Sequence, residues 1–142
     1  PRPRLRAYRP ETAIAEKVHS MVVLGTKNSR MRDFFDVHVL AMRESFDGDP
    51  LARALIATFG RRNTKIPAEL PLALTPAFAE VEGKRAQWSA FLTRIRPSVA
   101  AEELEDLIRV IAKCVGPALV AAAGDQQYPY RWAPGGPWSS SS

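Results

Sequence analysis

The chain has 142 residues, is 46% hydrophobic and carries a formal net charge of +5. This is enough chain for one domain with its own core, and the positive charge favours an anionic partner. One cysteine, Cys114, excludes an internal disulfide framework and fits a cytoplasmic protein. The longest apolar run, 107–123, is interrupted by Arg109 and Lys113, so we expect no membrane span.

Composition divides the sequence into three parts. Residues 1–9 combine prolines with several arginines and are predicted to form an extended basic arm. Residues 10–123 carry apolar side chains at helical spacing and are predicted to form a helical domain. Residues 124–142 are rich in Gly, Pro and Ser, which favours a flexible tail. The chain starts with Pro1 rather than Met, which suggests a fragment of a longer protein.

Helices account for all the regular structure that the pattern predicts. No alternating strand pattern is present, so the fold class is mostly or wholly α, a bundle of about five to seven helices. Gly116 and Pro117 should kink or split the last helix. The expected helices are 10–24, 29–46, 50–59, a short one after Thr75, 84–95 and a long one capped by Ser98.

Charged side chains stand at fixed places in the first two predicted helices. Lys17 lies in the first helix, and Asp33 and Asp36 share one face of the second. A lysine suits a phosphate as a point charge, and carboxylates hold magnesium or activate an attacking hydroxyl in nucleotidyl transfer. The alternative is ordinary ion pairing, because Arg30 and Arg32 stand three and four residues before these acids.

The residues around these charges resemble a known family. ETAIAEK at 11–17 and NSRMRDFFD at 28–36 are similar to the C-terminal half of AbiEii/AbiGii nucleotidyltransferase-type toxins, and segments 51–62 and 87–92 extend the resemblance. It implies that Lys17 faces the nucleotide triphosphate and that the catalytic acid is Asp33 or Asp36, with Asp33 favoured.

The resemblance also implies partners. The complete protein would use NTP and Mg²⁺ and modify an RNA acceptor, and an antitoxin would oppose it. The family's N-terminal lobe carries a Gly-Ser turn and an Asp-x-Asp metal pair on a small sheet, and we expect neither of these in this chain. We therefore expect no metal site within this chain and no activity from it alone. His19 and His38 lack a third ligand and are expected to pack or hydrogen-bond.

Glu16 is expected to have a supporting role. It is adjacent to Lys17, so the two side chains point about 100° apart on a helix and cannot pair well. We predict that Glu16 binds an arginine of the following helix, Arg30 or Arg32, and orients the loop.

Two basic clusters offer a different function. Lys27, Arg30 and Arg32 surround the acidic pair, and Arg61 and Arg62 follow the third helix. Both clusters are candidates for binding a phosphate or a nucleic-acid backbone. The alternative to a nucleotidyltransferase is therefore a non-catalytic helical module that binds nucleic acid or a partner protein.

Overall fold

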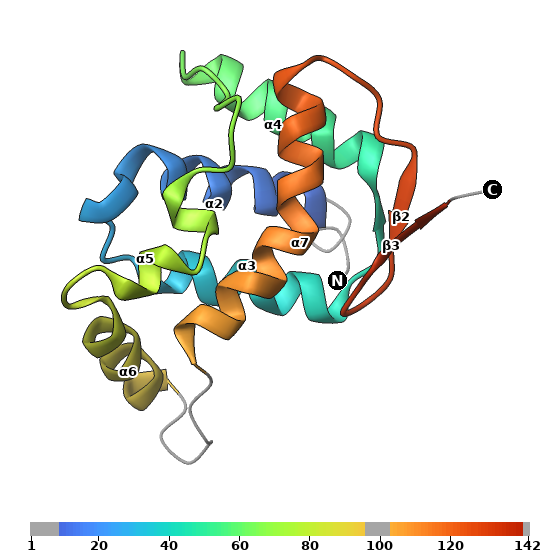
Figure 1. Cartoon of the computed structure of the whole chain (residues 1–142). Helices are drawn as coiled ribbons and strands as arrows, with labels where there is room; N and C mark the ends of the chain where they lie inside the picture. The colour runs from blue at the N-terminus through green and yellow to red at the C-terminus, as the bar shows by residue number, and fades with distance from the viewer. Residues whose placement is uncertain (1–8, 96–102, 141–142) are drawn as a thin grey trace, which may run out of the picture.

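The computed structural model describes residues 9–95 and 103–140, which pack around one core (Figure 1). These ranges contain six α-helices and one small sheet, so the prediction of a mostly helical fold is confirmed. The elements are α2 (Pro10–Leu24), η1 (Gly25–Lys27), α3 (Met31–Arg43), β1 (Phe46–Asp47), α4 (Gly48–Arg61), η2 (Leu72–Leu74), α5 (Ala77–Glu80), α6 (Lys84–Ile95), α7 (Leu104–Ala123), β2 (Tyr130–Trp132) and β3 (Trp138–Ser140).

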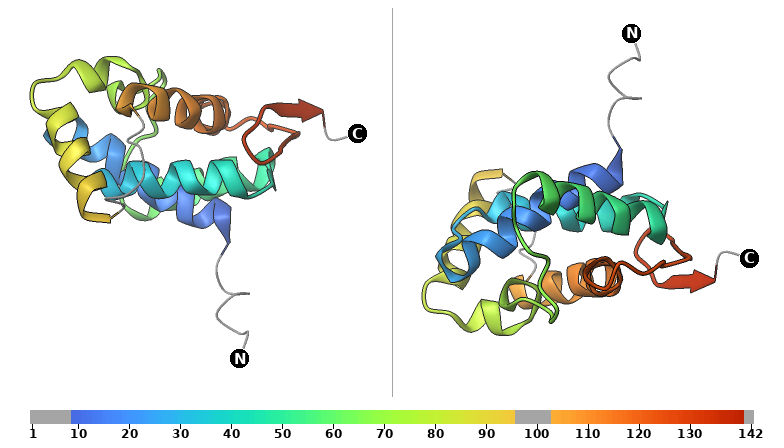
Figure 2. Two further views of the ribbon diagram at one scale, coloured as in Figure 1. Left: turned by 90° about the horizontal axis from the view of Figure 1, so that it is seen from below. Right: turned by 90° about the horizontal axis from the view of Figure 1, so that it is seen from above.

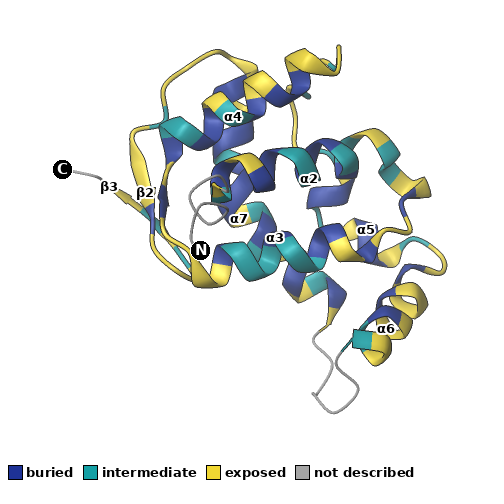
Figure 3. Ribbon diagram, turned by 180° about the vertical axis from the view of Figure 1, so that it is seen from behind, coloured by how far each residue is buried: buried dark blue, intermediate teal, exposed yellow. Residues whose placement is uncertain are grey.

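The long helices form two layers. Helix α2 packs against α3 on one side and α4 on the other, and α7 lies across α3 and α4 as the second layer (Figure 2). Helix α7 can cover both because its apolar side chains recur at helical spacing and are buried (Figure 3). Helix α6 stands at the end of the molecule remote from the sheet.

The ends of α2 and α3 place their charged residues side by side. Pro10 begins α2 with its fixed φ, and Gly25 ends it with φ of 53°, a conformation that suits glycine. Asn28 Oδ1 accepts a hydrogen bond of 2.7 Å from the Arg30 backbone N–H and fixes the turn into α3. After this turn α3 runs alongside α2, and Lys17 in the middle of α2 lies within ion-pair distance of Asp36 in α3.

The C-terminal segment differs from the predicted flexible tail. Strands β1, β2 and β3 form an antiparallel sheet in that order. Trp132 in β2 is only 1% exposed, and its indole N–H donates to Ala41 O at 2.7 Å. The expectations of an unstructured tail and of no strands are corrected. The second helix is also shorter than expected, because it ends at Arg43 and Phe46 begins β1.

Helix α7 continues through Pro117 without a break, so the predicted split is not observed. Proline has no backbone N–H, and the carbonyl four residues earlier, that of Lys113, loses its helical donor. The indole N–H of Trp138 points at this position, 3.1 Å from Lys113 O and 3.0 Å from Cys114 O. The C-terminal strands thus satisfy a carbonyl that the proline leaves open. None of the described helices is long and apolar enough to cross a bilayer.

Candidate functional site

A cleft of about 600 Å³ opens between α2, the start of α3 and α6. Its lining is cationic, with four basic side chains and one acid. The charged lining residues are Lys17, Arg30, Arg32, Asp33 and Arg94. A concave surface with this excess of positive charge attracts an anionic ligand.

Lys17 comes from the middle of α2 and reaches across to α3. Its Nζ lies 3.1 Å from Asp36 Oδ2, and an Arg32 guanidinium nitrogen lies 3.8 Å from Asp36 Oδ1. The predicted pairing of Arg32 with Asp36 is confirmed. Asp36 does not line the cleft itself. It lies beside the cleft and is shared by two cations that do.

Asp33 is the acid of the cleft, and its residue is only 3% exposed. Arg30 Nε lies 3.3 Å from Asp33 Oδ2, which confirms the predicted ion pair, but this oxygen accepts no hydrogen bond. Burial raises the pKa of Asp33 above the usual range, and this outweighs the lowering by Arg30 and Lys17. A carboxyl with raised proton affinity at a cleft wall is suited to accept a proton.

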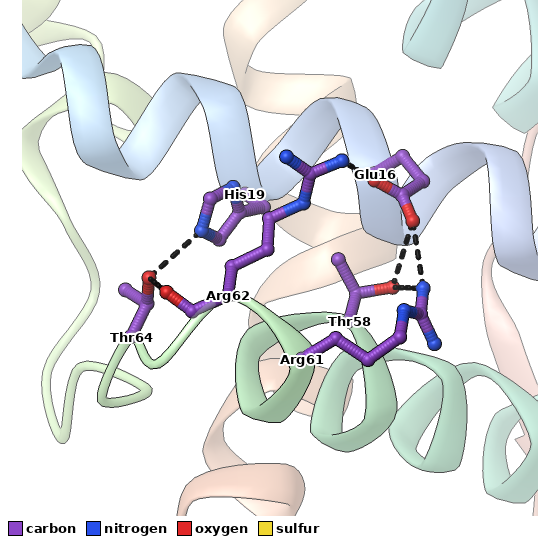
Figure 4. A network of polar contacts seen from close by, with 6 residues as sticks. All are labelled: Glu16, His19, Thr58, Arg61, Arg62 and Thr64. Atoms are coloured by element: carbon purple, nitrogen blue, oxygen red, sulfur yellow. Dashed lines mark hydrogen bonds and ion pairs between the residues drawn. The ribbon is translucent and has the colours of Figure 1, made fainter.

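The other predicted residues lie elsewhere. Lys27 is in η1 and does not line the cleft. Arg61 and Arg62 are at the end of α4, where both guanidinium groups bind Glu16 at 2.8 and 2.7 Å (Figure 4). The predicted bond from Glu16 to Arg30 or Arg32 is therefore wrong. Glu16 and Lys17 point in different directions from α2, and with Lys17 facing α3, Glu16 faces α4.

Glu16, Arg61 and Arg62 form what we call the Glu16 cluster, and His19 lies next to it along α2 (Figure 4). Burial acts to raise the pKa of Glu16, but hydrogen bonds from Arg62 and Arg61 prevail and the pKa is lowered. His19 Nε2 lies 2.9 Å from Thr64 Oγ1, and its ring meets Phe59 edge-on at 5.0 Å. The expectation that His19 packs and hydrogen-bonds is confirmed. Burial and Arg62 lower the pKa of His19, against the opposing charge of Glu16.

Sequence reasoning missed the contribution of α6. Gln87, Phe91 and Arg94 all line the cleft, whereas the sequence predicted a helix at 84–95 and no site residue within it. The signal was present, because positions 87, 91 and 94 stand four and three residues apart and share one helical face. Gln87 and Arg94 are the polar residues of that face and lie on either side of Phe91 along the helix.

The described residues form no ready-made site for a magnesium ion. No three His, Cys, Asp or Glu side chains gather in the described part of the chain. An Asp-x-Asp triplet does occur at 47–49, after the Glu-Lys motif, and sequence reasoning overlooked it. Its carboxylates are engaged: Asp47 lies 2.9 Å from the Arg131 guanidinium, and Asp49 Oδ1 accepts a hydrogen bond from the Tyr128 backbone N–H.

A cationic cleft that holds a lysine and a buried carboxyl is the kind of site found in proteins that handle phosphorylated substrates. Residues 1–110 match the family described as nucleotidyl transferase AbiEii toxin, type IV toxin–antitoxin system. The chain belongs to this family, which supports a nucleotidyl-transfer toxin role. No curated protein and no solved structure matches the chain. The family match spans α2 to α6 and the start of α7, and it ends before β2 and β3.

Proposed function

We propose that this chain forms the triphosphate-binding part of a nucleotidyltransferase toxin that transfers a nucleotide from an NTP to a hydroxyl group of RNA. The observation that carries the proposal is that Lys17 and Asp33 share one cationic cleft. Lys17 is the triphosphate ligand and Asp33 the catalytic acid–base residue, and Asp36 holds Lys17 in position through their 3.1 Å ion pair.

The proposed reaction is an in-line displacement. The acceptor oxygen forms a bond to the α-phosphorus, the bond from that phosphorus to the bridging oxygen of the β-phosphate breaks, and pyrophosphate leaves. The ionised carboxylate of Asp33 takes the proton of the attacking hydroxyl, for which its raised pKa is suited. Lys17, Arg30 and Arg32 offset the negative charge of the triphosphate from the cleft wall.

Magnesium and the Asp-x-Asp pair belong, in this proposal, to a further lobe of the complete protein. The 142-residue chain alone is then inactive, although it can still bind phosphate groups. The proposal includes an antitoxin that opposes the activity, and it places the reaction in the cytoplasm, where NTP and RNA are available.

The test is transfer of label from an α-labelled NTP to RNA by the protein joined to its N-terminal lobe. We expect Lys17→Ala and Asp33→Asn to lower the rate at least about a hundredfold, because they remove charge stabilisation and the proton acceptor. Lys65→Ala is the matched control, since Lys65 is exposed and outside the cleft. Retained transfer in both cleft variants would remove the assignment of these two residues.

A nucleic-acid-binding module is the second candidate, because the Arg61 and Arg62 side chains remain 59% and 55% exposed beside Glu16. Such a module would bind RNA with a steep salt dependence that survives Lys17→Ala and is lost in Arg61→Ala/Arg62→Ala. The carboxylate of Glu16 bonds both guanidinium groups and offsets part of their charge, so we rank this function second.

A further inference from the structure

We propose that Arg94 on α6 is a phosphate-binding residue that completes the triphosphate site from the wall opposite α2 and α3. The inference rests on the proposed function, because it assigns a further residue to the same cleft. It concerns a residue of α6, a helix that carries neither the Glu-Lys nor the Arg-Asp motif.

The first observation is the position of Arg94. Gln87, Phe91 and Arg94 lie on one face of α6, and this face lines the cleft together with Lys17 and Asp33. A ligand that fills this cleft of about 600 Å³ therefore contacts α6 as well as Lys17. Helix α6 is thus a wall of the site and not only a packing element.

The second observation is that Arg94 differs from the other cations of the cleft in its acidic partners. The other three cations of the cleft have acidic partners: Lys17 and Arg32 pair with Asp36, and Arg30 pairs with Asp33. Among the described residues, no carboxylate lies within ion-pair distance of Arg94. Its guanidinium carbon lies 6.0 Å from the centre of the Phe91 ring. Arg94 can therefore bind an anion without giving up an ion pair to any carboxylate of the described residues.

A third observation is that two arginines of the cleft each lie near the ring of Phe91. Arg32 lies 5.5 Å from the centre of Phe91, the same ring that Arg94 approaches. Both arginines also line the cleft, so each adds to its positive potential, and a bound anion offsets that potential. A planar guanidinium also offers paired N–H donors to phosphate oxygens, which suits this ligand better than a single ammonium group does.

Helix α6 is held firmly in this place. The buried Lys84 Nζ donates to Asn28 O at 2.8 Å, and this links the start of α6 to the loop before α3. Further along, the rings of Phe35 and Phe91 meet edge-on at 5.7 Å. The α6 wall is therefore fixed relative to Arg30 and Asp33, and the phosphate site is preorganised.

The geometry points to a nucleotide triphosphate rather than to an RNA backbone. A triphosphate concentrates several negative charges over a few ångströms, whereas a polynucleotide spreads single charges along its strand. The cationic side chains of the cleft converge on one concave surface, which matches the concentrated charge.

The test measures binding by titration calorimetry on the whole chain, with inorganic tripolyphosphate and with a single-stranded oligoribonucleotide that has hydroxyl ends. Arg94→Gln should weaken tripolyphosphate binding about tenfold and leave the oligoribonucleotide unchanged. Arg94→Lys, which keeps the charge but not the paired donors, should lose less. Arg85→Gln is the matched control on the same helix, because Arg85 pairs with Glu80 and Glu105 and does not line the cleft.

Equal tripolyphosphate affinity in Arg94→Gln and Arg85→Gln would overturn the inference, and so would no binding of tripolyphosphate by the unmodified chain. A loss confined to the oligoribonucleotide would also overturn it, since Arg94 would then belong to the acceptor. The proposed function fails by a different result, which is retained label transfer in Lys17→Ala and Asp33→Asn. Loss of transfer in those variants with unchanged affinity in Arg94→Gln would reject the α6 assignment alone.

Discussion

Two neighbouring residues of α2, Glu16 and Lys17, face different surroundings. On the α4 side, Glu16 accepts hydrogen bonds from Arg61 and Arg62, and these bonds lower its pKa despite some burial. On the α3 side, Lys17 faces a cleft whose acid, Asp33, is buried, has one oxygen without a hydrogen bond and has a raised pKa. On the α4 side of α2, the Glu16 carboxylate is hydrogen-bonded through both oxygens. On the α3 side, the Asp33 carboxylate has one oxygen without a hydrogen bond.

The difference in pKa distinguishes a carboxyl group that stabilises the fold from one that can take part in proton transfer. A lowered carboxyl pKa means that the folded protein favours the ionised form, so the Glu16 cluster stabilises the fold. A raised pKa means that the fold disfavours the ionised form of Asp33, and such a group is more often found where a protein needs proton transfer. Sequence spacing alone does not distinguish these clusters, because both contain acids next to arginines.

Asp33→Asn should have the largest effect on the α3 side. We expect nucleotide transfer by the complete protein to fall at least about a hundredfold, because the amide cannot accept the proton. Stability at pH 7 should rise, by less than about 1 kcal/mol, because the buried ionised group is removed. Activity and thermal unfolding measured on the same preparation check both parts. Lower stability together with normal transfer would show that Asp33, like Glu16, stabilises the fold and is not the proton acceptor.

Asp36→Asn should have the next largest effect and a different pattern. Asp36 does not line the cleft but holds Lys17 and Arg32, so we expect transfer to fall about tenfold through misplacement of Lys17. Stability should decrease rather than increase, because two partially exposed ion pairs are lost. A loss of transfer as large as that of Asp33→Asn, with unchanged stability, would give Asp36 the catalytic role.

Replacing both Arg61 and Arg62 by glutamine tests the α4 side. We expect the free energy of unfolding to fall by about 0.5–1 kcal/mol, since the ion pairs are partly exposed. Because the folded pKa of Glu16 is lowered, this stabilisation is present above its ordinary value of 4.5 and disappears as the pH falls through the folded pKa. Denaturant unfolding at pH 7 and pH 3 measures both. Tripolyphosphate affinity should change less than about twofold, and a larger loss would place these arginines in the binding site.

The sequence was sufficient for the helical fold, which follows from local apolar periodicity. That Lys17 and Asp33 belong to one site was implied by the family resemblance, because spacing within a helix shows which side chains share its face and not which two helices meet. The partner of Glu16 could not be derived in this way. Arg61 and Arg62 lie 45 and 46 residues away, and only the packing of α4 against α2 brings them near.

The C-terminal sheet shows where local patterns fail. Strands of two and three residues are too short to display an alternating pattern, and the surrounding Gly, Pro and Ser residues favour a tail. The strands are held by long-range contacts instead. Trp132 donates to the end of α3 at Ala41, and Trp138 donates to the carbonyl of Lys113 that Pro117 leaves open. Tryptophans within a polar segment were the available signal, because buried indole groups usually find an acceptor.

His19 gives the smallest expected effect and extends the comparison to mildly acidic pH. Burial and Arg62 lower its pKa below the ordinary value of 6.5, so the folded protein holds this proton less tightly than the unfolded chain. Its contribution to stability is complete above that value and decreases as the pH falls below it. The midpoint of thermal unfolding should therefore decrease between pH 7.5 and pH 5.5, and His19→Gln should decrease less. His38→Gln, which changes the other histidine of the chain, is the control. An equal decrease in His19→Gln and the unmodified protein would show that the α4 side of α2 is not sensitive to pH in this range.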